Sequence, residues 1–350
     1  MKDVAARAGV SMTTVSHILN RKRGFSVSAK TRQRVLDAAR ELKYRPNVHA
    51  RHLAQGQSSA VGLIISEISN PYFPDIIQGF EKAASERGLE LLLCNTEYES
   101  ARVEAAVHKM IDDKVRGVAV MTSMFDESYA KELVAHRIPV VHLSSSLNHP
   151  LLKRLQVDYS KGFSAALQHL LSLGHQSFGV ISGPLNTNSA VSIRDALIDA
   201  LARHGLQPSH ILESQYKVDA GASAVETLRS KPPLPTALLC CNDLIALGAI
   251  SALQEAGIRV PQDISVVGCD DLYFARLARP PLTTVHVPRQ EMGRLAFQML
   301  CAIRQRATRS DLKPSVETHV VIRKSTAASR GPVPISVEKG YPSGEPIYRG

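Results

Sequence analysis

The chain has 350 residues, 44% of them hydrophobic and 21% charged, a composition that suits a globular protein of two or three domains. It contains no run of 18 apolar residues and no apolar segment near its first residue, so we expect no membrane partner, no secretory signal and a cytoplasmic location. Its five cysteines include no C-x-x-C pair, which argues against a disulfide framework and against a structural zinc site.

Residues 2–20 predict two short helices joined by a tight turn. Gly9 suits a turn that needs a positive φ angle, and Ser11 can cap the second helix by accepting a backbone N–H. The second helix buries a face made of Val15, Ile18 and Leu19. It presents outward the side chains of Met12, Thr13, Ser16 and His17. A helix, a turn with glycine and a second helix form the arrangement that places a recognition helix in the DNA major groove.

The positive charge of the chain is concentrated in this same part. Residues 1–58 contain twelve Lys or Arg and three acids, which accounts for nine of the ten net positive charges. A basic segment on a nearly neutral body is typical of a module that binds phosphates. Charge and helix pattern therefore favour a DNA-binding segment independently of each other.

A third helix is predicted over residues 29–42, with Ser28 as its N-cap. Its buried stripe is predicted to consist of Val35, Leu36, Ala39 and Leu42. Pro46 breaks the chain after it, and residues 47–54 can form two helical turns before a linker that ends near residue 59. A helix this short is marginal in water, so it needs DNA or a second copy of itself to become ordered.

From residue 60 onward, apolar runs alternate with amphipathic helices in two similar blocks, about 60–158 and 159–287. A helix at 289–305 and a strand near 316–322 follow them. This alternation predicts two α/β lobes with parallel sheets that helices cover on both faces. Residues 327–350 hold four prolines and four glycines, so we expect them to form a disordered tail.

Polar side chains follow the predicted strands at the points where the strands end. They are Ser66, Asn95, Ser123, Asn242, Asp243, Asp270 and Asp271. Ligands of open α/β sheets bind outside the carboxyl ends of the strands, so two facing lobes would gather these groups in one cleft. Hinge closure around a small ligand is the natural motion of such a pair. For Asn242 and Asp243, capping of the following helix is an equally good interpretation.

Two other classes of protein compete with a DNA-binding regulator. An enzyme is not expected, because the chain has no Walker loop, no G-x-S-x-G and no G-x-G-x-x-G after a strand. A solute-binding protein would carry a signal peptide and would lack the basic N-terminal segment. No cofactor and no metal site are expected; His49 and His52 could face one way, but no third ligand accompanies them.

Motifs spread over residues 2–326 resemble those of the lactose repressor/galactose repressor (LacI/GalR) family of bacterial transcription regulators. In the N-terminal part they are Asp3-Val4-Ala5, Gly9-Val10-Ser11, Thr14-Val15-Ser16, Val27-Ser28, Thr31-Arg32, Tyr44-x-Pro46-Asn47 and Ala50-Arg51-x-Leu53. Further on they include Asn70-Pro71-Tyr72-Phe73, Leu173-Gly174-His175, Gly183-Pro184, Val260-Pro261-x-Asp263 and Pro281-Leu282-Thr283-Thr284.

The resemblance implies a small all-α helix-turn-helix domain (1–45), a hinge (46–59) and a two-lobed periplasmic-binding-protein-like α/β core (60–326). The N-lobe would take about 60–158 and 288–314, and the C-lobe 159–287 and 315–326. It also implies a homodimer that binds double-stranded DNA at a palindromic operator. The DNA-binding positions carried over are Met12, Thr13, Thr14, Ser16, His17, Asn20, Ser28, Thr31, Asn47, Arg51 and Leu53. Leu53 matches a hinge leucine that wedges into the minor groove.

The resemblance places a small-molecule effector between the lobes and implies that its binding changes the operator affinity. The positions carried over are Tyr72, Phe73, Ser123, Ser189, Arg194, Tyr216, Asn242 and Asp270. Tyr72 and Phe73 would stack on a ring, Arg194 would bind ligand oxygens, and Asp270 would accept from ligand hydroxyls. A sugar or sugar derivative is the first expectation, with a purine as the alternative. An inducer and a corepressor are both compatible with the sequence.

Overall fold

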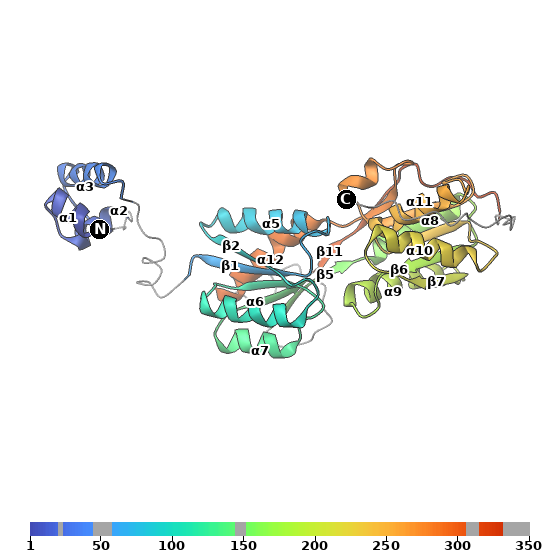
Figure 1. Cartoon of the computed structure of the whole chain (residues 1–350), viewed down its shortest axis with the longest axis horizontal. Helices are drawn as coiled ribbons and strands as arrows, with labels where there is room; N and C mark the ends of the chain where they lie inside the picture. Colours follow the sequence, from blue (N-terminus) through green and yellow to red (C-terminus); the bar gives the residue numbers. More distant parts are fainter. Residues whose placement is uncertain (20–23, 45–57, 144–151, 306–314, 332–350) are drawn as a thin grey trace, which may run out of the picture. The chain divides into compact units, whose positions relative to one another are not determined.

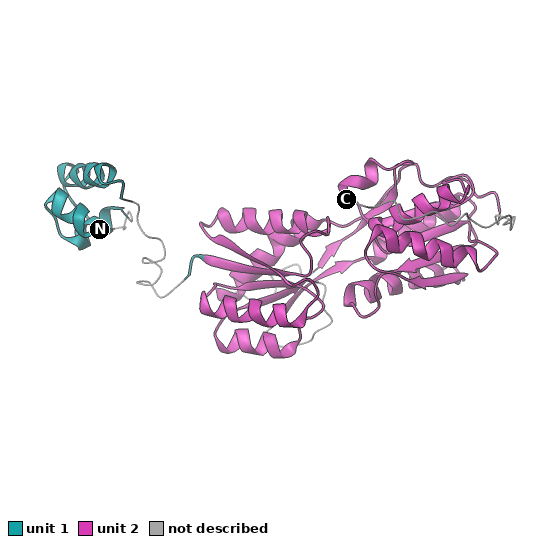
Figure 2. Cartoon of the chain, in the orientation of Figure 1, with its two compact units in different colours: residues 1–59 teal, residues 60–350 magenta. Residues whose placement is uncertain are grey.

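The computed structural model describes residues 1–19, 24–44, 58–143, 152–305 and 315–331. The chain divides into two compact units, residues 1–59 and 60–350, which Figure 2 colours separately. The predicted hinge helix and four predicted DNA-binding positions lie outside the described residues; these positions are Asn20, Asn47, Arg51 and Leu53. Among the described helices, none is both long and apolar enough to cross a membrane.

The first unit is a bundle of three helices. They are α1 (Lys2–Ala8), α2 (Met12–Leu19) and α3 (Ala29–Glu41). Its small core consists of Val4, Ala5, Ala8, Val15, Ile18, Val35, Ala38 and Ala39. The turn between α1 and α2 has the predicted form, since Gly9 has a φ of 58° and Ser11 Oγ accepts the backbone N–H of Thr14 at 3.1 Å. The Arg34 guanidinium donates to the carbonyl of Ala8 at 3.1 Å and so ties α3 to the end of α1.

Helix α3 differs from its prediction at the C-terminal end. The helix stops at Glu41, and Leu42, which the helical pattern predicts to be buried, is 43% exposed. Ala38 takes its place in the core, because Leu42 follows the last helical turn and its side chain no longer lies on the buried stripe. At the other end Ser28 caps the helix as predicted, with its Oγ accepting from the N–H of Thr31 at 3.1 Å.

Substitution of Ser28 by Ala is expected to lower the free energy that holds α3 closed by about 1 kcal/mol, because one backbone donor loses its cap. Hydrogen exchange of the full-length protein would then show the amides of α3 exchanging about fivefold faster. Ser28→Asn, which keeps a capping oxygen, serves as the control and should exchange like the wild type. Equal exchange rates in the Ala variant would contradict the capping role.

The second unit contains two α/β lobes, each built on a six-stranded sheet (Figure 1). The strands of the first lobe are β1 (Ala60–Ile65), β2 (Glu90–Asn95), β3 (Val118–Met121), β4 (Val140–Leu143), β5 (Leu152–Asp158) and β11 (Ser315–Glu317). They are all parallel, in the order β11-β5-β4-β3-β1-β2. Helices α5 (Phe73–Ser85) and α12 (Arg289–Arg304) cover one face, and α6 (Ser100–Asp112) and α7 (Glu127–Ala135) cover the other.

The second lobe repeats this plan. Its strands are β6 (Phe178–Ser182), β7 (His210–Glu213), β8 (Ala237–Cys240), β9 (Ser265–Asp270), β10 (Thr283–His286) and β12 (His319–Val321). Their order is β12-β10-β9-β8-β6-β7, parallel except for the antiparallel pair β10 and β12. The helices are α8 (Ser160–Ser172), α9 (Asn188–Ala202), α10 (Val218–Arg229) and α11 (Asp243–Glu255), with a short 3-10 helix, η1 (Tyr273–Arg276). The predicted fold, two lobes with parallel sheets after a helix-turn-helix unit, is confirmed.

The last crossing between the lobes lies three residues later than predicted. The expected single strand near 316–322 is two short strands, β11 in the first sheet and β12 in the second, so residues 315–317 belong to the first lobe. Thr318 separates them: its hydroxyl donates to the carbonyl of Asp158 at 2.8 Å and accepts the N–H of Gly162 at 3.2 Å. These bonds hold the chain at the point where it leaves one sheet for the other.

The beginning of the predicted disordered tail is in fact bound to the second lobe. The N–H of Ala327 donates to Ser265 Oγ at 3.1 Å, and the N–H of Ser329 donates to the carbonyl of Leu173 at 2.8 Å. The composition of residues 327–350 did not reveal these backbone contacts, because backbone hydrogen bonds do not depend on the side chain. Residues 332–350 lie outside the described part of the chain.

Helices α5 and α12 of the first lobe approach each other so closely that glycine is required at the contact. A methyl group at Gly79 would overlap the carbonyl oxygen of Gln290, and a methyl group at Gly293 would overlap the carbonyl oxygen of Ile76. The two helices therefore pack backbone against backbone. A hydrogen bond of 2.7 Å between the side chains of Gln290 and Gln78 lies beside this contact.

Candidate effector pocket and DNA-binding unit

A pocket of about 810 Å³, open mouth included, lies between the two lobes at the carboxyl ends of their strands. Ser66 follows β1, Ser123 follows β3, and Asp270 ends β9, so the sheets of both lobes contribute to the pocket wall. Its aromatic lining consists of Tyr72, Phe73, Tyr98, Phe125, Tyr159 and Tyr216. A concave, mostly apolar site with a few polar groups is the usual form of a small-molecule site.

Seven of the eight side chains predicted to contact an effector line this pocket. They are Tyr72, Phe73, Ser123, Ser189, Tyr216, Asn242 and Asp270. The structure does not bring Arg194 to the pocket: its guanidinium binds the carboxylate of Asp195 at 2.7 Å. Ile193, which is 4% exposed, lines the pocket instead. Adjacent residues of an α-helix point about 100° apart, so a shift of one residue replaces a cation by an apolar side chain.

The start of α5 holds two aromatic side chains in the pocket. The N–H of Tyr72 donates to Asn70 Oδ1 at 3.0 Å, which fixes the turn before the helix. The rings of Tyr72 and Phe73 meet edge to face with centroids 5.8 Å apart. Burial raises the pKa of the Tyr72 phenol well above its usual range, so this side chain is a neutral donor and acceptor. The hydroxyl of Tyr72 donates to Met292 Sδ at 3.9 Å, so the helix offers a ligand mainly apolar ring surface.

The second lobe supplies a third aromatic wall. The hydroxyls of Tyr216 and Ser189 lie 3.2 Å apart, and the ring of Tyr216 covers Gly183, where a Cβ would clash with it. Burial also raises the pKa of Tyr216, which keeps this phenol neutral. A glycine is therefore needed at position 183 to admit the ring into the wall of the pocket.

Asp270 is the acidic group of the pocket and is 5% exposed. Burial, and then the nearby carboxylate of Asp243, raise its pKa well above the usual range. Among the described residues, no hydrogen-bond donor reaches either the Asp270 carboxylate or the buried hydroxyl of Ser123. Buried polar groups are normally paired, so Ser123 Oγ is an atom that a ligand would satisfy, and the Asp270 carboxyl group lines the same pocket.

Asn242 and Asp243 have different roles in the structure. Asn242 lines the pocket and also caps α11, since its Oδ1 accepts from the N–H of Ile245 at 2.9 Å. Asp243 neither caps the helix nor lines the pocket. Its carboxylate is fully buried and accepts from the hydroxyl of Thr284 at 2.5 Å and the N–H of Leu272 at 2.7 Å.

Several residues of the pocket lining were not predicted from the sequence. Among them are Asn70, Phe125, His142, Tyr159, Ile193 and Cys241. Burial lowers the pKa of His142 to about 4, so its imidazole is neutral, and burial raises the pKa of the Cys241 thiol. Tyr159 directly follows β5 and could have been found by the strand-end rule, whereas His142 lies within an apolar run that gave no signal. No Lys or Arg occurs among the described lining residues.

Within the described ranges, no group of three or more His, Cys, Asp or Glu side chains is arranged to hold a metal ion. The buried cysteines are Cys240, Cys241 and Cys269. Burial raises the pKa of each thiol, which makes them inert packing groups rather than nucleophiles.

The predicted DNA-facing side of α2 is exposed at its N-terminal end only. Met12 is 53% exposed and Thr13 is also exposed, whereas Thr14 is half-buried with its hydroxyl 2.9 Å from that of Ser11. Ser16 and His17 are half-buried, and the ring of His17 meets Phe25 edge to face with centroids 4.4 Å apart. The prediction that these two residues face outward needs this correction: both are half-buried, and Phe25 covers part of the His17 ring.

Comparisons with known proteins give a family match in each of the two units. The family model described as bacterial regulatory proteins, lacI family, matches residues 1–47, and a periplasmic binding protein-like domain matches residues 167–326. The chain is 34% identical over 331 residues to the HTH-type transcriptional repressor PurR of Pasteurella multocida, covering 93% of this chain and 98% of that protein. It is 35% identical over 336 residues to PurR of Haemophilus influenzae strain PittEE, with the same coverage.

Solved structures show the same likeness. The lac repressor dimer bound to operator and the anti-inducer ONPF has a TM-score of 0.85 and 30% identity, over 93% of this chain and 98% of that chain. A complex of the transcriptional regulator CelR with cellobiose has a TM-score of 0.69 and 29% identity over the same shares. The chain therefore belongs to the lacI family of bacterial regulatory proteins: it is a DNA-binding transcriptional repressor with an effector-binding core.

Proposed function

We propose that this repressor binds an uncharged sugar or sugar derivative in the pocket between its lobes, and that this binding controls its affinity for a palindromic operator. The observation that carries the proposal is the Asp270 carboxylate, which lies without a donor among aromatic walls. Sugar hydroxyls would donate to the carboxylate, and the C–H faces of the sugar ring would pack on Tyr72, Phe73 or Tyr216.

Anionic effectors such as sugar phosphates, sugar acids and nucleotides are disfavoured by the same site. A buried anion needs a paired cation, and none of the described lining residues is Lys or Arg. The one cation expected there, Arg194, is paired with Asp195 instead. The complex of CelR, a relative, with the neutral sugar cellobiose supports the uncharged choice.

A free purine base is the second candidate. The relatives from Pasteurella and Haemophilus are PurR repressors, and a purine would offer N–H donors to Asp270 and a flat face to the aromatic side chains. The two candidates would give Ser123 different hydrogen-bond partners: its buried hydroxyl can pair with a hydroxyl of a sugar or with a ring nitrogen of a purine. Binding measurements with both classes decide between them.

For the DNA side, we propose that residues 1–45 read the operator and that residues 46–59 form the hinge between DNA and core. The exposed pair Met12 and Thr13 would reach base edges, with an apolar contact from Met12 and a hydrogen bond or thymine-methyl contact from Thr13. His17 would contribute through the part of its ring that Phe25 leaves uncovered. The hydroxyls of Ser28 and Thr31, at the start of α3, would donate to phosphates.

Thermal unfolding of the full-length protein against D-glucose, D-ribose, cellobiose, their phosphates, gluconate, hypoxanthine and adenine tests the proposal. A compound at 100 times its Kd should stabilise the core by about 2.7 kcal/mol. Asp270→Ala should weaken the best compound roughly 10-fold, because the hydrogen bonds between the ligand and the carboxyl group are lost. Asp195→Ala removes a carboxyl group outside the pocket and should leave the Kd unchanged. Stabilisation by phosphates or gluconate alone would refute the uncharged class.

A further inference from the structure

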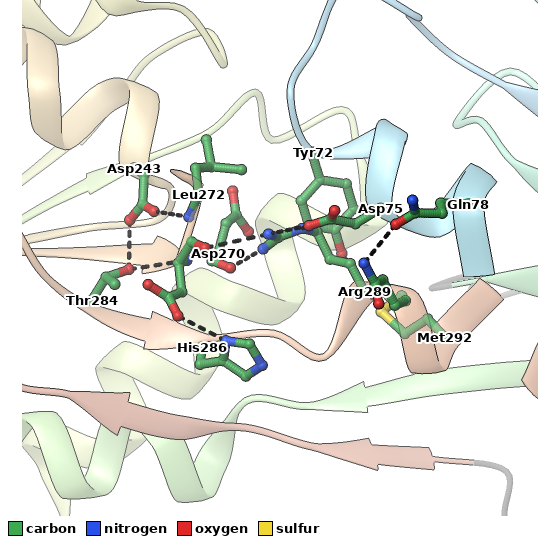
Figure 3. Close-up of polar contacts among 12 residues, drawn as sticks. Tyr72, Asp75, Gln78, Asp243, Asp270, Leu272, Thr284, His286, Arg289 and Met292 are labelled. Atoms are coloured by element: carbon green, nitrogen blue, oxygen red, sulfur yellow. Dashed lines mark hydrogen bonds and ion pairs between the residues drawn. The ribbon is translucent and has the colours of Figure 1, made fainter. Parts of the chain in front are cut away.

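The guanidinium of Arg289 joins the two lobes beside the pocket without lining it. Arg289 is the first residue of α12 in the first lobe and is 5% exposed. Its Nη2 and Nε bind the carboxylate of Asp75 in α5, at 2.7 and 3.2 Å. Its other donors reach the second lobe, where Nη1 donates to the carbonyl of Asp270 and Nη2 to that of Asp271 at 3.3 Å. Figure 3 shows the guanidinium between Asp75 and Asp270.

The carbonyls that Arg289 binds belong to an unusual turn at the end of β9. Asp270 has a φ of 113° and Asp271 a φ of 55°, so two consecutive residues other than glycine adopt positive φ angles. Such backbone conformations cost free energy and persist only where the surroundings hold them. This turn sets the direction in which the side chain of Asp270 leaves the strand, and hence its place in the pocket.

Other contacts hold the part of the turn that follows. The Asp271 carboxylate binds His286 Nδ1 at 2.9 Å and the Arg323 guanidinium at 2.5 Å. The N–H of Leu272 donates to Asp243. The carbonyl of Asp270, by contrast, has Arg289 as its partner among the described residues. The N–H of the same peptide, that of Asp271, donates to Thr284 Oγ1 at 3.4 Å. Within this network, Arg289 therefore holds the carbonyl side of the peptide that follows Asp270, and Thr284 holds its N–H side.

The other end of the bridge is rigid. Because Gly79 and Gly293 bring α5 and α12 into backbone contact, Arg289 and Asp75 cannot shift relative to each other without moving both helices. The residues that start α5, Tyr72 and Phe73, form one wall of the pocket, and the Arg289 guanidinium lies 5.8 Å from the centre of the Tyr72 ring. The position of Asp270 is therefore fixed relative to that aromatic wall.

We propose that Arg289 is a positioning residue: it holds the Asp270 carboxylate at a fixed place opposite Tyr72 and Phe73, and so sets effector affinity without touching the effector. The proposal rests on the proposed function in one respect, that Asp270 receives the effector. It implies that the Asp75–Arg289 ion pair links the two walls of the pocket, one from each lobe. A ligand held between the walls then acts on both lobes through a single buried cation.

Hydrogen exchange of the ligand-free, full-length protein tests the positioning. In Arg289→Met, the amides of Asp271 and Leu272 should exchange at least tenfold faster, because the turn before them is released. Arg289→Lys, which keeps the charge with fewer donors, should restore part of the protection. Arg259→Met serves as the matched control, since Arg259 forms a comparable pair with Asp263 on the surface of the second lobe. Unchanged exchange in Arg289→Met would overturn the proposal.

Ligand titration gives the second readout, with D-glucose, D-ribose, cellobiose, hypoxanthine and adenine as probes in thermal unfolding. For whichever probe stabilises the wild type most, Arg289→Met should raise the Kd at least tenfold and Arg289→Lys should recover part of the loss. Asp75→Asn, a milder change on a half-exposed side chain, should raise the Kd about threefold. Combined with Arg289→Met, it should add nothing further, because the pair is already broken. Additive losses would overturn the link between the walls.

The two readouts separate the failure of one proposal from the failure of the other. If no probe stabilises the wild type while the turn loosens in Arg289→Met, the sugar or purine assignment fails and the positioning stands. If a probe binds wild type and Arg289→Met equally well, the positioning fails and the assignment stands. Should Arg289→Met not fold, Asp75→Asn decides the question alone: faster exchange at Asp271 supports the proposal, and unchanged exchange overturns it.

Discussion

DNA binding by the full-length repressor is expected to weaken by roughly a thousandfold or more when the salt concentration rises from 50 to 200 mM. Residues 1–58 carry twelve basic and three acidic side chains. Each phosphate contact releases counterions from the DNA, so a protein with six to ten contacts shows a steep dependence of log K on log salt. The slope is measured by fluorescence anisotropy with an operator duplex obtained by in vitro selection from the protein itself.

A matched pair of variants assigns the slope to the first unit. Lys30→Gln removes an exposed charge from the first turn of α3, next to the cap that faces the proposed DNA side. This change should make the slope shallower by about one for each phosphate that is no longer neutralised. Arg259→Gln removes the same charge from the core and should leave the slope unchanged. A slope that corresponds to only one or two phosphates would show that the basic segment does not bind the DNA backbone.

The buried carboxyl group of Asp243 is expected to lower the stability of the core by a few kcal/mol between about pH 4 and pH 7. Burial raises the pKa of Asp243 to about 7, whereas an unfolded chain has a value near 3.9. Between these values the folded protein binds more protons than the unfolded chain, so this contribution is complete below about pH 4. It is lost as the pH rises through the folded pKa.

Asp243→Asn isolates this effect, because a carboxamide resembles the protonated acid and can donate to Thr284 while accepting from Leu272. In urea unfolding, the variant should match the wild type near pH 4 and exceed it progressively toward pH 8. Asp271→Asn should show the opposite trend: it should be less stable than the wild type above about pH 4 and approach it at lower pH. Although burial opposes it, hydrogen bonds from His286 and Arg323 lower the pKa of Asp271 to about 2, so its stabilisation is lost below pH 4. Parallel pH profiles for wild type and Asp243→Asn would contradict the assignment.

Local chemistry explains why so much of the fold was accessible from the sequence. The turn at Gly9, the caps Ser11 and Ser28, and the alternation of strands and helices after residue 60 each follow from a few neighbouring residues. The rule that ligands bind at the carboxyl ends of parallel strands then placed Ser123, Asn242 and Asp270 in one pocket. The turn and the caps depend on neighbouring residues, and the pocket rule depends on the order of strands and helices. A single sequence contains both kinds of information.

What the sequence could not provide depends on helix phase and on distant partners. Whether position 193 or 194 of α9 faces the pocket is decided by a rotation of about 100°, which a motif alone does not fix to one residue. The role of Arg289 depends on Asp75, more than two hundred residues earlier, and on a turn whose positive φ angles no local pattern announces. His142 lies within a buried apolar strand, so no alternation of polar and apolar residues marks it in the sequence.

The aromatic lining of the pocket has an optical consequence. The chain has no tryptophan, and of its nine tyrosines four, Tyr72, Tyr98, Tyr159 and Tyr216, line the same pocket. Ultraviolet emission of the protein therefore comes from tyrosine alone, and a large share of the emitting rings surrounds one small volume. A purine entering that volume would quench the emission by stacking, and a sugar would change it only by displacing water. The repressor thus carries an intrinsic fluorophore that reports which kind of molecule occupies its pocket.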